Sequence, residues 1–179
     1  MMASATEARP LVLGIDPGTA ITGYAVVRDD HEGPQLQASG AIFTPAHTPL
    51  PQRLFSIHRE LSAIIEAHRP SAMAVEKVFF SKNVRTALAV GHARGVVLLA
   101  AAIYGMSVFE YSPNEVKQAI SGYGGADKKQ MQNMVALLLH LDEVPTPDDV
   151  ADAIAIAICH IHTNRWQDVV AQGNSPSRK

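Results

Sequence analysis

The sequence is poor in cysteine: Cys159 is the only one among 179 residues. A single cysteine excludes a disulfide within the chain and any metal site built from several thiolates, and it fits a reducing compartment. Long apolar runs are also missing, because the longest, Val96–Ile103, is far shorter than the roughly 20 residues that span a membrane. Residues 1–9 lack the apolar segment of a secretory signal. We therefore expect a soluble cytoplasmic protein that does not bind membranes.

The overall composition is that of one ordinary globular domain. Hydrophobic residues make up 47% of the chain and charged residues 18%, and no internal repeat or second domain is evident. A chain of this length buries a sizeable core without disulfides or structural metals. We expect a folded domain over residues 11–166, a disordered N-terminus over 1–10 and a flexible polar tail over 167–179.

The net charge of −2 does not indicate a nucleic-acid-binding protein, but the distribution of charge is uneven. Residues 77–129 carry seven basic and three acidic side chains, whereas the flanking segments 1–76 and 130–179 each have three more acids than bases. A local basic field is what phosphate binding requires, whatever the total. The alternative, that these lysines and arginines only solvate the surface, remains open at this point.

Leu11-Val-Leu-Gly-Ile-Asp-Pro-Gly-Thr is the segment around which the chain is organised. Its apolar run predicts a strand buried on both faces, with Asp16 at the carboxyl end. Open α/β sheets usually bind their ligands at that end. Taken alone, Asp16 could equally be a turn residue, because Asp-Pro-Gly is common in turns.

The remaining pattern alternates short apolar strands with helices that have one apolar face. The second strand follows the first too closely for a crossover helix and predicts a hairpin, whereas the fourth follows a long helix and should be parallel to its neighbour. The fold class is therefore α/β, with a five-stranded mixed sheet flanked by helices. Further strands are predicted at Gly23–Val27, Leu36–Phe43, Ala72–Val78 and Ser107–Tyr111, and helices at Gln52–His68, Val84–Tyr104 (the longest), Pro113–Ile120, Lys128–Leu139 and Asp148 to about Trp166.

A second carboxylate, Glu76, follows the apolar strand that begins at Ala72. A parallel crossover places its strand end beside that of Asp16, so the two acids can converge. Like charges held so close are costly unless a cation lies between them. The simpler alternative is a solvent-exposed glutamate at a strand end.

The last helix adds Asp149 and Asp152, which are three residues apart and share one face. For Asp149 a structural explanation is available, because acids in a first turn are favoured by the helix dipole and Thr146 could cap this helix. Asp152 lies beyond the first turn in a helix that is apolar on nearly every side. A carboxylate is rarely buried there without a cation.

Two acids from strand ends and two from one helix face form an all-oxygen ligand set. Such a set favours Mg²⁺ or Mn²⁺ over Zn²⁺. Two such ions about 4 Å apart stabilise the attacking and leaving oxygens of an in-line phosphoryl displacement. Together with the basic stretch, this predicts phosphodiester hydrolysis in a nucleic acid.

A linked set of motifs, in this order, resembles the RuvC family of Holliday junction resolvases over about Leu11 to His162. The motifs are Gly14-Ile-Asp-Pro-Gly with Thr22-Gly-Tyr, Val75-Glu-Lys-Val-Phe, Lys82-Asn, Gly91-His-Ala-Arg-Gly-Val, Phe109-Glu-Tyr-Ser-Pro with Val116-Lys-Gln, and Asp149-Val-Ala-Asp-Ala. The resemblance implies a ribonuclease-H-like fold, a homodimer, and Mg²⁺-dependent cutting of four-way DNA junctions in recombination and repair. It also implies work on the nucleoid with a RuvA-RuvB-type branch-migration complex.

The family's functional residues can be carried over position by position. Its metal-binding acids fall on Asp16, Glu76, Asp149 and Asp152, its functional lysines on Lys117 and Lys128, and its DNA-stacking aromatic on Phe79. All four acids are present. Lys77 stands where relatives have glutamine, which affects only the expected DNA contacts.

Other DNA contacts are inferred from the residues themselves. One ring of the pair Phe79–Phe80 can stack on bases, because two adjacent rings in a loop cannot both point into the core. Lys128 lies near a helix start, where the dipole disfavours a cation, and this position indicates a phosphate partner. The candidate DNA-binding residues are Lys77, Phe79, Phe80, Lys82, Arg85, Lys117, Lys128 and Lys129.

Two other functions fit parts of the pattern. Actin-like phosphotransferases also begin with a strand, Asp-x-Gly-Thr and a hairpin, but they need a second lobe for which 179 residues leave no room. A non-catalytic module for branched DNA would be free to lose one of the four acids, and none is lost. The leading interpretation is therefore a junction-resolving endonuclease.

Overall fold

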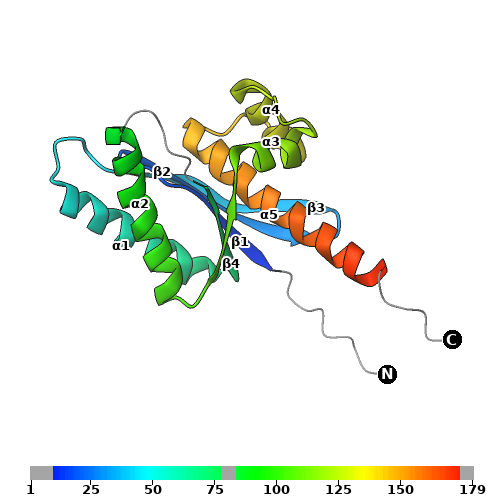
Figure 1. Ribbon diagram of the computed structural model, residues 1–179, viewed down its shortest axis with the longest axis horizontal. Coiled ribbons are helices and arrows are strands. Elements are labelled where there is room, and N and C mark those ends of the chain that lie inside the picture. The colour runs from blue at the N-terminus through cyan, green and yellow to red at the C-terminus, as the bar shows by residue number, and fades with distance from the viewer. Residues whose placement is uncertain (1–9, 78–83, 174–179) are drawn as a thin grey trace.

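The computed structural model describes residues 10–77 and 84–173, which form a five-stranded sheet with helices on both faces (Figure 1). The strand order is β3-β2-β1-β4-β5, so the strand that ends in Asp16 lies in the centre. Within the described residues, no helix is long and apolar enough to cross a membrane. The expected five-stranded mixed sheet is confirmed.

Three antiparallel strands form one half of the sheet: β1 (Leu11–Asp16), β2 (Ile21–Asp30) and β3 (Gly33–Phe43). The hairpin between β2 and β3 is longer than expected, because its strands pair as far as Asp30 and Gly33. The strands predicted at Gly23–Val27 and Leu36–Phe43 are therefore too short. At this end Asp29 pairs with Pro34 and Asp30 with Gly33 through their main chains, Pro34 is buried, and Gly33 adopts a φ of +132° that favours glycine.

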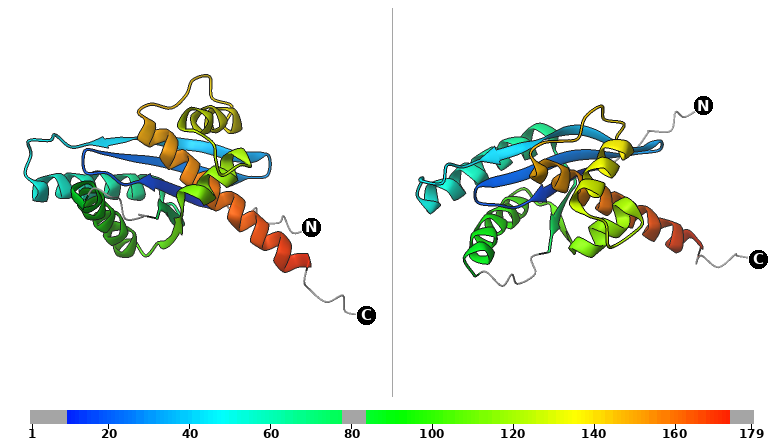
Figure 2. Two further views of the ribbon diagram at one scale, coloured as in Figure 1. Left: turned by 45° about the horizontal axis from the view of Figure 1, so that its top comes forward. Right: turned by 90° about the horizontal axis from the view of Figure 1, so that it is seen from above.

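Two parallel strands complete the sheet: β4 (Ala72–Glu76) pairs with β1, and β5 (Ser107–Tyr111) pairs with β4. Each is reached through a crossover helix, first α1 (Leu50–His68) and then α2 (Val84–Ile103). Both helices pack on the same face of the sheet (Figures 1 and 2), where Leu13, Ile15 and Val75 are fully buried.

The opposite face is covered by α5 (Asp148–Gly173), which crosses β1 and β2, with α3 (Pro113–Ser121) and α4 (Lys128–Leu138) beside it (Figure 2). This helix, and not α2, is the longest among the described residues, and it continues seven residues past the expected end at Trp166. Trp166 and Gln167 are exposed, so a pattern of buried apolar residues does not predict this last part of the helix.

Two glycines allow α5 to lie directly on the strands. A Cβ added at Gly14 would collide with the carbonyl oxygen of Ala153, and one at Gly23 with the carbonyl oxygen of Asp149. Only glycine permits such close approach of two backbones. The three-layer arrangement with this sheet order is the ribonuclease-H-like fold that was expected.

Candidate active site

A cavity of about 200 Å³ opens at the carboxyl ends of β1 and β4, between α3, α4 and α5. Its polar lining comes from five of the expected residues: Asp16, Glu76, Asp152, Lys117 and Lys128. The rest of the wall is largely apolar and includes Val116 and Met131. The structure therefore brings residues from five separate segments to one place.

Strand alternation directs two of these carboxylates to the same side of the sheet. Residues 13 and 15 of β1 point toward α1 and α2, so Asp16 points toward α5. In β4, Met73 and Val75 point toward α2, which turns Glu76 toward α5. Because Ile15 pairs with Val75 in parallel register, the acids that follow them emerge side by side.

The charges of these acids are poorly compensated by the protein alone. Burial raises the pKa of Asp16 to about 7, with further contributions from the charges of Asp152, Glu76 and Asp149, while Lys128 acts in the opposite direction. Burial, together with other acids, also raises the pKa of Glu76 and of Asp152. A group of buried carboxylates with raised pKa values is stabilised when positive charge lies between them.

Lys128 is the cation that the structure places among the acids. Its Nζ lies 3.6 Å from Oδ2 of Asp152 and 3.0 Å from Oδ2 of Asp148. The hydrogen bond to Asp148 is the main reason that the pKa of Lys128 is raised and that of Asp148 is lowered. The unfavourable place of a cation at the start of α4 is thus compensated by acids at the start of α5. Asp148 is exposed and also accepts a hydrogen bond from Gln132.

Asp149 takes part in the site at longer range. It is half-buried in the first turn of α5 and does not line the cavity, but its charge contributes to the raised pKa of Asp16. Among residues 10–77 and 84–173, no three Asp, Glu, His or Cys side chains are arranged closely enough to hold a metal ion. The donor chemistry nevertheless fits a hard divalent cation, since all four groups are carboxylates and they repel one another.

The remaining candidates for DNA contact divide into two groups. Lys77 and Lys129 are exposed, Lys77 directly after β4 and Lys129 in the first turn of α4. Phe79, Phe80 and Lys82 lie outside the described residues. Arg85 belongs to the first turn of α2, and its side chain is not described either.

Two arginines that sequence reasoning did not single out support the strand ends from the α1–α2 side. Arg94 of α2 donates to the main-chain carbonyl of Glu76, and Arg53 of α1 donates to the carbonyl of Thr19 in the turn after Asp16. The sequence places Arg94 in the basic stretch and in the motif Gly91-His-Ala-Arg-Gly-Val, without a role of its own. A bond to a main-chain carbonyl leaves no signal in the sequence, because every residue has that group.

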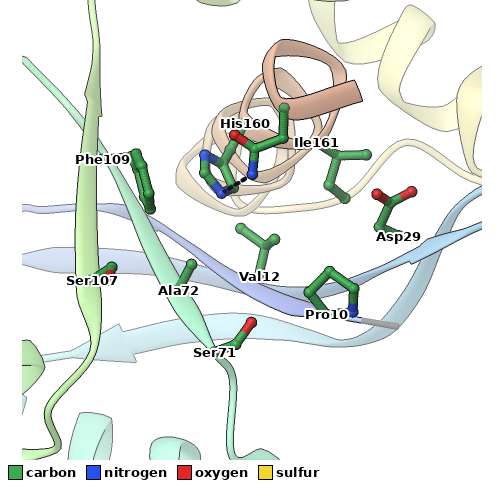
Figure 3. Close-up of a pocket in the computed structure, with 10 residues that line it drawn as sticks. Pro10, Val12, Asp29, Ser71, Ala72, Ser107, Phe109, His160 and Ile161 are labelled. Atoms are coloured by element: carbon green, nitrogen blue, oxygen red, sulfur yellow. Dashed lines mark hydrogen bonds between the residues drawn. The ribbon is translucent and has the colours of Figure 1, made fainter. Parts of the chain in front are cut away.

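A second cavity, of about 220 Å³, lies at the other end of the strands, where β1, β4 and β5 begin (Figure 3). Its main polar group is His160, whose ring lies 4.3 Å from that of Phe109. Both ring nitrogens are engaged, Nδ1 with the hydroxyl of Tyr111 and Nε2 with the amide of Asn164. Its one carboxylate, Asp29, is bound to Arg165. The cavity at Asp16 is therefore the better candidate for catalysis.

The family model described as "Crossover junction endodeoxyribonuclease RuvC" matches residues 12–160. The chain belongs to the RuvC family. The resemblance noted from the sequence is thereby confirmed, and a phosphotransferase is not favoured.

RuvC relatives match this chain over nearly their full length. The crossover junction endodeoxyribonuclease RuvC of Heliobacterium modesticaldum is 55% identical over 156 residues, which are 87% of this chain and 96% of the relative. That of Chloroflexus aggregans is 58% identical over 151 residues, covering 84% of this chain and 92% of the relative. The two relatives thus align with almost the whole of the folded part.

Solved structures give the same result. The structure of Thermus thermophilus RuvC in complex with a Holliday junction substrate has a TM-score of 0.84 and 37% identity, covering 88% of this chain and 96% of that chain. The yeast mitochondrial Holliday junction resolvase shares the fold, with a TM-score of 0.66 at 14% identity, over 95% of this chain and 87% of that chain.

Proposed function

We propose that this protein resolves four-way DNA junctions by metal-dependent hydrolysis of phosphodiester bonds. The observation that carries the proposal is the cavity in which carboxylates from β1, β4 and α5 meet Lys117 and Lys128. Family membership supports the reaction class, and the Thermus thermophilus relative, at 37% identity, is described with a Holliday junction substrate.

The metal is proposed to be Mg²⁺, with Mn²⁺ as an alternative, and two ions are held by Asp16, Glu76, Asp149 and Asp152. Hard carboxylate oxygens select these cations. When bound, the ions supply electrostatic stabilisation of the attacking and leaving oxygens. The raised pKa of Asp16 supports this ligand set, because a carboxylate that is costly to ionise in the protein alone is stabilised by a nearby cation.

Lys117 and Lys128 are proposed to contact the phosphate that is cut. Lys117 is half-buried in the cavity wall, and Lys128 reaches Asp152 from the start of α4. More than half of the Lys128 side chain is exposed, so its ammonium can also face a phosphate at the cavity mouth. Both side chains offer positive charge where a phosphate must approach a group of acids.

The neighbouring basic and aromatic residues are proposed to hold the DNA arms. Lys77 and Lys129 are exposed at the edges of the site and suit phosphate contacts. Phe79 and Phe80 are proposed to stack on bases at the junction, and Lys82 and Arg85 to contact its backbone.

A homodimer is proposed to form through α2. Leu88, Leu99 and Ile103 recur along one side of this helix and are 55–59% exposed. Gly91 and Gly95 lie on the same side, with nothing near a Cβ added at either position. A stripe of exposed apolar and small residues is typical of a helix that packs against another protein surface. Two-fold symmetry would place one acid cluster on each of two opposing DNA strands.

The family resemblance also suggests a partner and a place of action. We propose that the dimer works on the nucleoid with a RuvA-RuvB-type branch-migration complex that brings junctions to it. Co-sedimentation of the three components with a four-way junction would test this part separately.

The central experiment is cleavage of a synthetic four-way junction in the presence of Mg²⁺ or Mn²⁺. Asp16→Asn, Glu76→Gln, Asp149→Asn and Asp152→Asn should each reduce cleavage by at least about 100-fold, because each removes a charged metal ligand. Junction binding, measured in Ca²⁺, should change little because the basic surface remains. A wild-type protein that binds junctions but never cuts them would contradict the proposal and favour a binding module.

A further inference from the structure

Arg94 is the arginine of α2 that connects the ends of two neighbouring strands. Its Nη1 donates a hydrogen bond of 2.7 Å to the main-chain carbonyl oxygen of Glu76, and its Nη2 forms an ion pair with Glu110 of β5. The arginine side chain is largely buried, and Glu110 is partly exposed. One guanidinium therefore binds the last residue of β4 and the adjacent strand at the same time.

Arg94 approaches Glu76 from the face of the sheet that is opposite the cavity. Tyr111 and Phe109 of β5 point toward α5, where both contact His160, so Glu110 between them points toward α2. The Glu76 carboxylate points toward α5 and the catalytic cavity. The guanidinium thus lies on the opposite side of the sheet from the cavity, and it acts on Glu76 through the peptide group.

The end of β4 has few other constraints. Pairing of β4 with β1 stops at Val75 and Ile15, one residue before Glu76. On the other side the ladder continues with the amide of Lys77, which donates to the carbonyl of Tyr111. The Glu76 carbonyl lies beyond the paired part of the β1 edge, and Arg94 is the group that binds it.

We propose that Arg94 is a positioning residue that holds the Glu76 carboxylate in place for metal binding. The inference rests on the proposed function of Glu76 as a ligand. Residues that orient ligands without touching the metal typically contribute about 10- to 100-fold to metal affinity or activity. A shift of about 1 Å at a reacting group can also cost about 100-fold in rate.

The test compares Arg94→Lys with Arg165→Lys in the full-length protein. Arg165 is a matched control, because it too binds one carboxylate, that of Asp29, and one main-chain carbonyl, that of Asp30. It does so at the opposite end of the sheet, where β2 pairs with the start of β1. The same substitution therefore removes the same kinds of contact, near the site in one case and far from it in the other.

Three quantities are measured: the single-turnover rate of junction cleavage, the junction affinity in Ca²⁺, and the affinity for Mn²⁺ by isothermal titration calorimetry without DNA. For Arg94→Lys we expect the rate to fall about 10- to 100-fold and Mn²⁺ to bind several-fold more weakly, with junction affinity within about 2-fold of wild type. Arg165→Lys should match wild type in all three. If Arg94→Lys does not fold, Arg94→Gln, which keeps an N–H donor, is measured in the same way.

Glu110→Gln separates the two contacts of Arg94. It removes the ion pair but leaves the bond to the Glu76 carbonyl, so its rate should stay within about 3-fold of wild type. The assignment is overturned if Glu110→Gln is as defective as Arg94→Lys, or if Arg94→Lys binds Mn²⁺ and cleaves like Arg165→Lys. Failure of wild type to cleave any four-way junction would instead refute the proposed function.

Discussion

Asp16 combines burial with repulsion from three neighbouring acids. Its pKa is raised from 3.8 to about 7, with burial as the largest cause and the other three acids next. The pKa of this carboxyl is higher in the folded than in the unfolded state. Its contribution to the free energy of unfolding is therefore fully present at pH values below the pKa of the unfolded state. This contribution is lost as the pH rises through the pKa of the folded state. The relevant window therefore runs from about pH 4 to pH 7.

This linkage predicts how the metal-free protein responds to pH. In EDTA, the free energy of unfolding should fall as the pH rises from about 4 to 7, and Asp16→Asn should become more stable than wild type by up to roughly 4 kcal/mol at the alkaline end. Chemical denaturation at several pH values measures this difference. Mn²⁺ should stabilise wild type more than Asp16→Asn. If the difference in stability between Asp16→Asn and wild type does not change with pH, the pKa of Asp16 is not raised in the folded protein.

A second prediction at this scale concerns Lys117. Its replacement by alanine should weaken junction binding and reduce the slope of log K against log salt by about 1, because one phosphate contact and its released counterion are lost. Arg59→Ala is the control, since Arg59 is an exposed cation of α1 on the far face of the sheet. Binding titrations at four or more salt concentrations give the slopes. Equal slopes for Lys117→Ala and wild type would place this lysine off the DNA path.

Individual residues also show why parts of the site can be predicted from the sequence and others cannot. Asp16 and Glu76 can be placed because each follows an apolar strand whose topology is evident. Asp152 stands out because it interrupts an otherwise apolar helix. Arg94 and Asp148 are not predictable in this way, since their contacts depend on how helices lie across the sheet.

At the scale of elements, the two glycines beneath α5 determine how closely the helix approaches β1 and β2. Gly14→Ala or Gly23→Ala should push the helix outward, with a cost of about 1–3 kcal/mol in the free energy of unfolding. The cleavage rate should fall by more than the loss of folded protein explains, because Asp149 and Asp152 move away from the strand ends. Gly124→Ala is the control, as its added Cβ would meet only the Gln118 side chain at 3.9 Å. Thermal unfolding and cleavage rates together measure the two effects.

Element boundaries were less predictable than element types. Asp29, Asp30 and Pro34 are residues typical of turns, yet the hairpin continues through them because main-chain pairing does not require apolar side chains. The end of α5 was misplaced for a related reason, since periodic burial stops before the helix does. By contrast, both ends of β5 were predicted correctly, because Gly105 before it and Pro113 after it interrupt the strand pattern.

For the whole molecule, the exposed stripe of α2 predicts a dimer. Leu99→Glu should convert it to a monomer in analytical ultracentrifugation, because a charge would be buried at the centre of the interface. On a supercoiled plasmid with an extruded cruciform, wild type should give mostly linear DNA through paired cuts, whereas the monomer should give nicked circles. Phe55→Glu, on the exposed side of α1, is the control. A wild-type monomer with full activity, or mainly nicked circles from wild type, would contradict the paired mechanism.

The contact of α5 with Gly14 and Gly23 has a consequence for how this protein can change during evolution. The spacing between the acids of α5 and those of the strands is determined mainly by direct contact of the α5 backbone with the backbones of β1 and β2. Neighbouring core side chains such as Ile154 and Ile158 can therefore be exchanged for others of similar volume with little effect on that spacing. The two glycines have no such freedom. The core sequences of distant homologues can thus diverge while the arrangement of the four acids stays constant.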